Sequence, residues 1–353
     1  MIWLTWRQFR IQALVAFAAL AALALALGLT GPNLAHLYAR TCGSSSHCTA
    51  AFLTAMKADT VYPLLYFAGA AVIYLAPLII GIFWGAPMVA REIEAGTFRL
   101  TWNQSITRTR WLMVKLAIAG LAAMAFGGLA SLMVTWWASP IDRAGGFPVG
   151  ISQLSRFQPE VFGARGIVPI GAAALAFTLG VTAGTLIRRM LPAMAVTLGL
   201  FAAALVAMPL WVSPHLITPA QYTHPITVNL TTMQMTGSGE INDPVTTLPG
   251  AWILSDQVIN KTGQVFVLPS VPVCQSGTQR QCDAWLARQP LRQYVTYQPA
   301  SRYWLFQWFE TAIWLAISLA LSALCLWRIK TLLSERPVAP APSTALVQCG
   351  AGG

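Results

Sequence analysis

Charged residues are scarce in this chain. Asp, Glu, Lys and Arg make up 9% of its 353 residues, whereas hydrophobic residues make up 56%. A soluble globule of this length needs a larger share of polar residues to cover its surface. The composition therefore excludes an ordinary soluble protein and predicts one that lies in a lipid bilayer.

Motifs of the common catalytic sites are missing as well. There is no Gly-x-x-x-x-Gly-Lys-Ser/Thr, so the chain does not bind nucleotide through a P-loop, and neither Gly-x-Ser-x-Gly nor His-Glu-x-x-His occurs. The four histidines, His36, His47, His215 and His224, are scattered along the chain. We therefore expect no catalytic residue, no metal ion and no cofactor in this chain.

The apolar residues fall into six long runs, each with the roughly 20 residues that a transmembrane helix needs. The runs are rich in Ala, Leu and Gly and do not alternate, which favours helices over a barrel. The first run is too long for the core of a signal peptide and lacks a clear cleavage site, so we interpret it as retained. We predict an all-α polytopic membrane protein with transmembrane helices at about 11–31, 63–89, 111–137, 166–187, 191–212 and 304–327.

Lysine and arginine set the orientation of such a protein. With the N-terminus inside, the short inner segments hold 12 of the 22 Lys and Arg residues, and the other 10 are spread over much longer outer segments. We therefore predict cytoplasmic termini. The net charge of +11 is then explained by topology and anionic headgroups, without nucleic acid. The excess of Arg and Ala is typical of a GC-rich bacterial genome, which indicates a bacterial plasma membrane.

Three segments lie outside the spans. Residues 1–10 carry aromatic side chains at helical spacing and predict an interfacial helix, or a plain extension of the first span. Residues 213–303 contain short apolar runs at 225–231 and 264–268, which predict a small extracytoplasmic α/β domain between helices 5 and 6. Residues 328–353 have low complexity and predict a disordered cytoplasmic tail.

Four cysteines fall in the outer segments. Cys42 lies close to Cys48, and Cys274 lies close to Cys282, with a polar turn between the members of each pair. Because outer segments face an oxidising compartment, we predict the disulfides Cys42–Cys48 and Cys274–Cys282, which would staple the external domain at the second pair. A metal site that also used His47 would match no common zinc spacing.

Glu310 is the one acidic residue that we expect to enter the bilayer. A charge at that depth costs at least about 2.5–3.5 kcal/mol, so its carboxyl should face protein or water, pair with Arg302 or Arg165, or be protonated. Two interpretations stay open. Glu310 forms an intramembrane polar site for a substrate or a proton, or it is structural and lies in the polar boundary beneath the external domain.

The connection between the second and third spans, residues 91–110, is crowded with charge. Gly96 permits a sharp turn, and Thr97 can cap a short helix that carries Phe98 and Trp102 on one side. The segment therefore predicts a helix across the inner mouth of the bundle, with charge exposed to a docking partner. Two glycine pairs, Gly81-x-x-x-Gly85 and Gly180-x-x-x-Gly184, allow close approach of helices but are too common to identify a subunit interface.

At these residues the chain resembles the permeases of ABC-2 type transporters. Glu-x-Glu-x-Gly-Thr, followed by Ser-Ile-Thr-Arg and Lys115, resembles their first intracellular loop. The succession Gly-Ala-Pro, Arg-Glu, Gly-Thr, Gln-Ser and Thr-Arg from Gly85 to Arg110 is similar to that of an actinobacterial group. The six spans, the short loop between spans four and five and the long external segment before span six agree with the family, although that segment is longer than the family's usual re-entrant helices.

The resemblance implies a function. The chain would be the permease subunit of an exporter, it would pair as a homodimer with two separate ATPase subunits, and those subunits would bind ATP and magnesium. The family's coupling helix corresponds to residues 91–110. The residues expected to contact the ATPase are Arg91, Glu92, Glu94, Gly96, Thr97, Phe98 and Trp102.

Two alternatives come from other classes of protein. The first is a polytopic membrane enzyme that acts on lipid or cell-wall intermediates through its external domain, with His215, His224, Asp243 and Asp256 as candidate residues. The second is a sensor or immunity subunit, in which the external domain binds a peptide. A copurifying ATPase would separate the transporter and the sensor from the enzyme.

Overall fold

The computed structural model describes residues 2–42, 48–94, 108–149, 152–225, 234–235, 241–242, 248, 250–266 and 279–331. Six helices in these ranges are long and apolar enough to cross a membrane, which confirms the six predicted spans. Their bounds are Arg10–Cys42, Val61–Arg91, Thr109–Arg143, Val168–Ile187, Met190–His215 and Ala300–Lys330.

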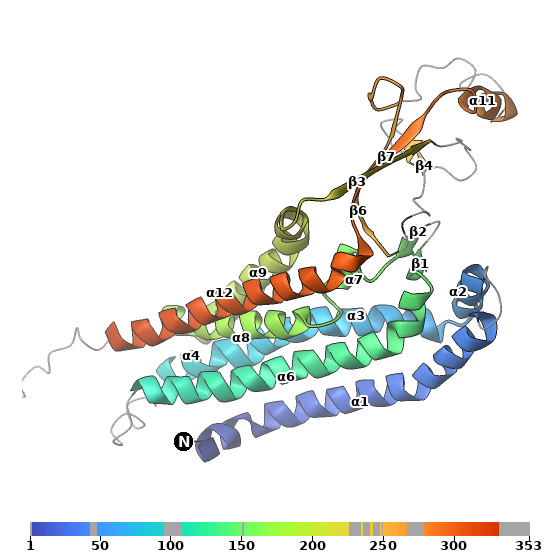
Figure 1. The fold of residues 1–353 in the computed structure, drawn as a ribbon. Coiled ribbons are helices and arrows are strands. Elements are labelled where there is room, and N and C mark those ends of the chain that lie inside the picture. The colour runs from blue at the N-terminus through green and yellow to red at the C-terminus, as the bar shows by residue number, and fades with distance from the viewer. Residues whose placement is uncertain are drawn as a thin grey trace, which may run out of the picture.

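The spanning helices lie side by side in one bundle, and a β-sheet projects from one end of it (Figure 1). We call that end the sheet end, and the other end, where α4 stops and α9 begins, the distal end. The helices of the spans are α1 (Ile2–Cys42), α3 (Val61–Ile80), α4 (Ala86–Glu94), α6 (Arg108–Arg143), α8 (Val168–Ile187), α9 (Met190–Ala207) and α12 (Tyr303–Thr331). Because α1 is continuous from Ile2, residues 2–9 extend the first span, and their position in the interface stays a prediction.

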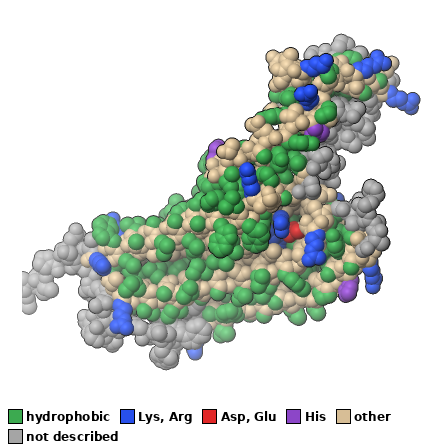
Figure 2. Space-filling model, in the orientation of Figure 1, with side chains coloured by type: hydrophobic (Ala, Val, Ile, Leu, Met, Phe, Trp, Pro, Cys, Tyr) green, Lys and Arg blue, Asp and Glu red, His purple; other side chains and the backbone are tan. Residues whose placement is uncertain are grey.

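On the face of the bundle shown in Figure 2, hydrophobic side chains are spread along its length, and Lys and Arg lie mostly towards its ends and on the projecting part. Large apolar side chains such as Leu14, Leu29, Leu64 and Leu319 are each more than three-fifths exposed. Exposed apolar area on this scale is unfavourable in water and matches the hydrocarbon core of a bilayer. The surface therefore agrees with the membrane location predicted from composition.

Helix α8 is the centre of the bundle. Most of its residues are buried, and it contacts α6, α9, α12 and both halves of the second span. Its side chains are mainly Ala, Gly and Thr, and the hydroxyls of Thr178, Thr182 and Thr185 bond to carbonyl oxygens one turn back on the same helix. Because these hydroxyls are satisfied within α8, the middle of the helix can be buried on all sides at little polar cost.

Glycines allow α8 to touch the second span backbone to backbone. Between α3 and α4 the second span has one π-helical turn, η1 (Gly81–Gly85). A Cβ atom added at Gly184 would lie 2.6 Å from the carbonyl oxygen of Ala86, and one at Gly180 would collide with the carbonyl oxygen of Gly81. The two glycine pairs of the sequence therefore pack against each other within one chain.

The start of α8 is fixed by a side chain from α12. The amide oxygen of Gln307 accepts hydrogen bonds from the backbone N–H groups of Ile167 at 2.9 Å and Val168 at 3.2 Å. Its amide nitrogen donates to the carbonyl oxygen of Phe162 at 3.3 Å. Gly166 lies beside this amide with a left-handed backbone, at φ 64°. A Cβ atom at this position would lie only 2.5 Å from the amide oxygen of Gln307. Gln307 thus satisfies the free donors of a buried helix N-terminus.

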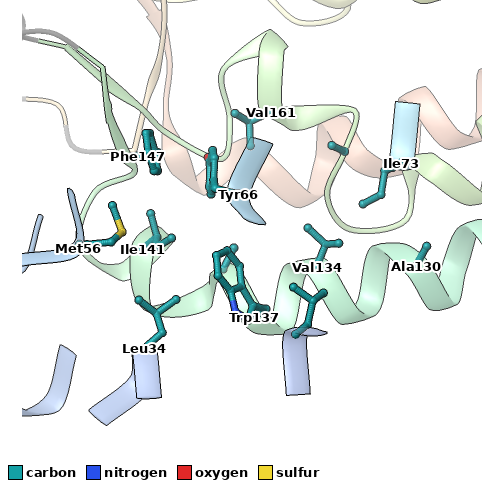
Figure 3. Packing of buried hydrophobic residues seen from close by; sticks show 14 of the residues in the cluster. Leu34, Met56, Tyr66, Ile73, Ala130, Val134, Trp137, Ile141, Phe147 and Val161 are labelled. Carbon is teal, nitrogen blue, oxygen red and sulfur yellow. The ribbon is translucent and has the colours of Figure 1, made fainter. Parts of the chain in front are cut away.

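A second core lies at the sheet end, between α1, α3 and α6 (Figure 3). Helix α2 (Cys48–Ala58), which lies within the predicted first outer loop, covers it with Phe52 and Met56, both fully buried. The indole N–H of Trp137 on α6 donates to the hydroxyl of Thr30 on α1 at 2.9 Å. The sheet end of the bundle is therefore packed well beyond the predicted ends of the spans.

The projecting part contains both strands and a helix. A three-stranded antiparallel sheet has the strand order β3-β7-β6, and helix α11 lies between β6 and β7 in sequence. Two short antiparallel pairs accompany it. The bounds are β1 (Phe147–Val149), β2 (Ser152–Leu154), α7 (Pro159–Phe162), β3 (Ala220–Pro225), β4 (Gln234–Met235), β5 (Ile241–Asn242), β6 (Trp252–Ile259), α11 (Gln279–Leu286) and β7 (Arg292–Gln298).

Only part of each of the two apolar runs that predicted strands lies among the described residues. The run at 225–231 only touches β3, which ends at Pro225, and residues 226–231 lie outside the described part. In the run at 264–268, Val265 makes a single antiparallel bridge with Ile259. The central strand β7 instead comes from the polar sequence RQYVTYQ. Its alternate residues Gln293 and Val295 are buried, so tertiary packing, not apolar content, selects it.

The structure describes the side chains of two of the four cysteines assigned to disulfides. Cys42 and Cys282 are each disulfide-bonded. The side chain of Cys48 and all of Cys274 lie outside the described part, so the two pairings stay predictions. Cys325 is free and buried in the last span.

We predict that Gly184→Ala destabilises the protein by about 1–3 kcal/mol, because the new methyl group must displace the backbone at Ala86. Gly199→Ala is the matched control, since no atom lies within 4 Å of a Cβ built there. It should leave the stability unchanged or raise it by up to about 1 kcal/mol through helix propensity. Thermal unfolding of the purified variants in detergent measures both effects, and equal melting temperatures would contradict the close contact.

Gln307→Met should destabilise the protein by about 1–3 kcal/mol, because two backbone donors at the start of α8 lose their acceptor in a buried setting. Gln264→Met, at an exposed position, serves as the control for the same change of side chain. The same thermal measurement applies. A melting temperature of Gln307→Met equal to that of the control would show that water replaces the amide.

Candidate functional site

The described residues of the predicted coupling segment, 91–94 and 108–110, lie at the distal end. Helix α4 ends at Glu94, and α6, the helix of the third span, begins at Arg108. Arg91 and Glu94 are exposed at the end of α4, as a surface for a docking partner requires. The side chain of Glu92 and the whole of residues 95–107, which include Gly96, Thr97, Phe98 and Trp102, lie outside the described part. Their predicted role is therefore untested.

Glu94 also joins α4 to the turn between α8 and α9, a link that sequence reasoning missed. Its carboxylate accepts a hydrogen bond from the backbone N–H of Met190, the first residue of α9, at 3.3 Å. The turn itself consists of Arg188, in the left-handed region at φ 59°, and Arg189. A carboxylate at a helix N-terminus is electrostatically favourable. Among the described residues, the distal end thus holds Glu94 together with Arg91, Arg188 and Arg189.

The sheet end contains a cavity of about 430 Å³. Its walls come from α3, from the connection that includes α7, from the first turns of α8, from the end of α9 with the π-helical turn η2 (Met208–Val212), from β6 and from α12. Most of the lining side chains are apolar. The cavity lies where the external domain meets the bundle, and it is the second candidate site.

Glu310 opens onto this cavity. Its side chain is 6% exposed, and one carboxylate oxygen accepts a hydrogen bond from the hydroxyl of Ser213 at 3.3 Å. The arginines that the sequence suggested as partners bond elsewhere. Arg302 donates to the carbonyl oxygen of Thr218 at 2.8 Å, and Arg165 donates to that of Val134 at 3.1 Å. Glu310 therefore lies in a cavity wall, beside a hydroxyl.

Aromatic rings form one wall of the cavity. The ring of Phe157 lies 5.3 Å from that of Phe306 and 5.9 Å from that of Trp252, measured between centroids. Phe162 and Trp314 also face the cavity. On the opposite side, the hydroxyl of Tyr74 donates to backbone oxygens of the α7 connection at 3.3 Å and holds that connection against α3. Rings anchored in this way form a rigid apolar surface.

Three of the residues suggested for a membrane enzyme are described, and each has contacts of its own. His215 contacts the carbonyl oxygen of Trp211, 2.7 Å away, whereas His224 stacks on Tyr222 in β3. Asp256 accepts a hydrogen bond from Gln293 at 2.8 Å. Asp243 lies outside the described part. Within the described ranges, no group of three or more His, Cys, Asp or Glu side chains is arranged to hold a metal ion.

A comparison with models of protein families matches residues 17–213 to the family described as ABC-2 membrane transporter related. The match runs from within α1 to the end of the fifth span and includes residues 91–110. No curated protein and no solved structure matches the chain. Because the matched residues make up more than half of the chain, this multi-pass membrane protein belongs to the ABC-2 membrane transporter related family.

Proposed function

We propose that this chain is the permease subunit of an ABC-2 type exporter and that a separate ATPase subunit drives it. The family match carries the proposal, since it covers five of the six spans together with the connection at 91–110. ABC-2 permeases generally pair with an ATPase subunit. The sequence has no P-loop of its own, so the nucleotide, with its magnesium ion, belongs to that partner.

The packing of the bundle offers a route from the ATPase to the cavity. When ATP closes the ATPase dimer, the coupling segments of two permease subunits are drawn together, and each pulls on its own α4. Because α4 and η1 touch α8 through Ala86 and Gly180, α4 cannot move without α8. Helix α8 in turn contacts α12, which carries Glu310. The bundle would then have two conformations that differ in the shape of the cavity, and nucleotide would favour the one to which it binds better.

We further propose that the sheet end is extracytoplasmic and that both termini lie in the cytoplasm of a bacterial cell. The positive-inside distribution supports this orientation, with Arg91, Arg188, Arg189 and Arg328 near the distal end. The disulfide-bonded state of Cys42 and Cys282 supports it too, because both lie towards the sheet end and disulfides persist in oxidising compartments.

The permease is expected to copurify with the ATPase encoded beside it, and Glu92→Arg with Glu94→Arg should weaken that association at least about tenfold, because like charges at an interface repel. Pull-down of the tagged permease, with ATP turnover of the eluate, measures the effect. The same reversal at Asp283, in α11 of the external domain, should change nothing.

The variant Glu94→Gln distinguishes the effect of the charge of Glu94 from the effect of its hydrogen bond to Met190. The amide keeps an oxygen acceptor for the N–H of Met190 but carries no charge. If it weakens the association while the melting temperature is unchanged, the carboxylate acts on the partner. A wild-type chain that retains no ATPase would contradict the proposed function.

PEG-maleimide labelling of the unfolded protein tests the disulfides and, through them, the orientation. Without reductant we expect two labels, on Cys325 and Cys349, and after reduction six, which is the number of cysteines in the chain. Cys282→Ser should add one label before reduction, on Cys274. Six labels without reductant in protein purified under air would contradict both the pairings and the extracytoplasmic position of the sheet end.

A further inference from the structure

The cavity at the sheet end carries acidic groups without basic ones. Among the described residues that line it, Glu160 and Glu310 have carboxyl groups, and none is a lysine, an arginine or a histidine. Glu160 is exposed at the rim, whereas Glu310 is almost fully buried. The described lining of the cavity thus has one carboxyl group at the rim and one in the interior, and no basic side chain beside them.

A buried carboxylate in apolar surroundings needs a cation or a proton. Transfer of an isolated charge into such surroundings is strongly unfavourable, and the hydroxyl of Ser213, 3.3 Å from the carboxylate, compensates only part of that cost. Arg165 donates to the backbone carbonyl oxygen of Val134, and Arg302 donates to the carbonyl oxygen of Thr218 and to the side-chain amide oxygen of Gln298. A ligand with a positive charge would complete the environment of Glu310.

The aromatic wall suits the same kind of ligand. The faces of Phe and Trp rings attract cations, most strongly where water is excluded. Trp252, Phe306 and Trp314 all line the cavity with Glu310. The adjoining ring of Tyr303, 5.8 Å from that of Phe157, already holds the guanidinium of Arg156 at 4.5 Å. One ring that adjoins the wall of the cavity thus already contacts a cation.

Size and access point to a lipophilic molecule. A volume of about 430 Å³ lies within the range of about 300–1,000 Å³ typical of sites for drug-sized ligands. Val206 and Leu210 belong to the lining and are 56% and 60% exposed on the apolar outside of the fifth span. The cavity therefore reaches the surface that faces lipid, where lipophilic cations accumulate.

We propose that this cavity binds lipophilic organic cations, with Glu310 as the charge partner and the aromatic rings as the wall. The proposal rests on the proposed function and deepens it, since it names the class of molecule that the permease exports. Binding itself requires no ATPase, so it can be tested on the purified chain alone.

Equilibrium binding of radiolabelled tetraphenylphosphonium to the full chain in detergent is the test. Saturable binding is expected, and unlabelled tetraphenylphosphonium should displace it whereas the neutral triphenylphosphine oxide should not. Glu310→Gln should raise the Kd at least about 30-fold, because a buried charge pair loses one partner. Glu160→Gln should raise it less than about fivefold, as expected at an exposed rim. Asp59→Asn, an exposed carboxylate outside this cavity, should not change it.

A second measurement covers the case in which Glu310→Gln does not fold. Tetraphenylphosphonium should raise the melting temperature of the wild-type protein, and triphenylphosphine oxide at the same concentration should not. Equal effects of the two compounds, absence of saturable binding, or wild-type affinity in a folded Glu310→Gln variant would each overturn the proposal. Because none of these readouts involves the ATPase, they leave the copurification test of the permease function independent.

Discussion

The close contact between α8 and the second span is the constraint on which the rest of the bundle depends. Four glycines remove the side chains that would hold the two backbones apart, and a carbonyl oxygen of one helix then occupies the space of the missing Cβ of the other. Without water and without a hydrophobic driving force between helices, such packing supplies much of their association in a bilayer. Helix α8 becomes fully surrounded, and the other spans take their positions around it.

The two candidate sites lie at opposite ends of this rigid pair. At the distal end, Glu94 ties α4 to the first residue of α9. At the sheet end, Gln307 ties α12 to the first turn of α8, one turn before Glu310 meets the cavity. Both links are single polar side chains that satisfy backbone N–H groups at a helix start. Between these two links, the direct backbone contacts of α8 with the second span form a close-packed connection.

Sequence reasoning failed where packing, and not apolar content, selects the structure. Helix α2 lies in a stretch that a span-by-span interpretation assigns to an outer loop, yet Phe52 and Met56 complete the core of α1, α3 and α6. Strand β7 is rich in polar residues, and its neighbours β3 and β6 determine its conformation. Among the alternatives offered for Glu310, the sequence could not indicate the contact with Ser213, nor that Arg302 and Arg165 donate to the carbonyl oxygens of Thr218 and Val134.

The sequence by itself determined the membrane class, the six spans, their helical form and the resemblance to ABC-2 permeases, because the bilayer imposes length and apolarity on each span locally. It also identified Glu310 as a residue whose charge is unfavourable in the bilayer, and two glycine pairs that allow helices to approach closely. Only the tertiary structure decided that the glycine pairs meet each other, that Glu310 faces a cavity with aromatic walls, and that Glu94 reaches α9. These outcomes depend on contacts between residues about 90 or more positions apart, and no local pattern specifies which distant partners meet.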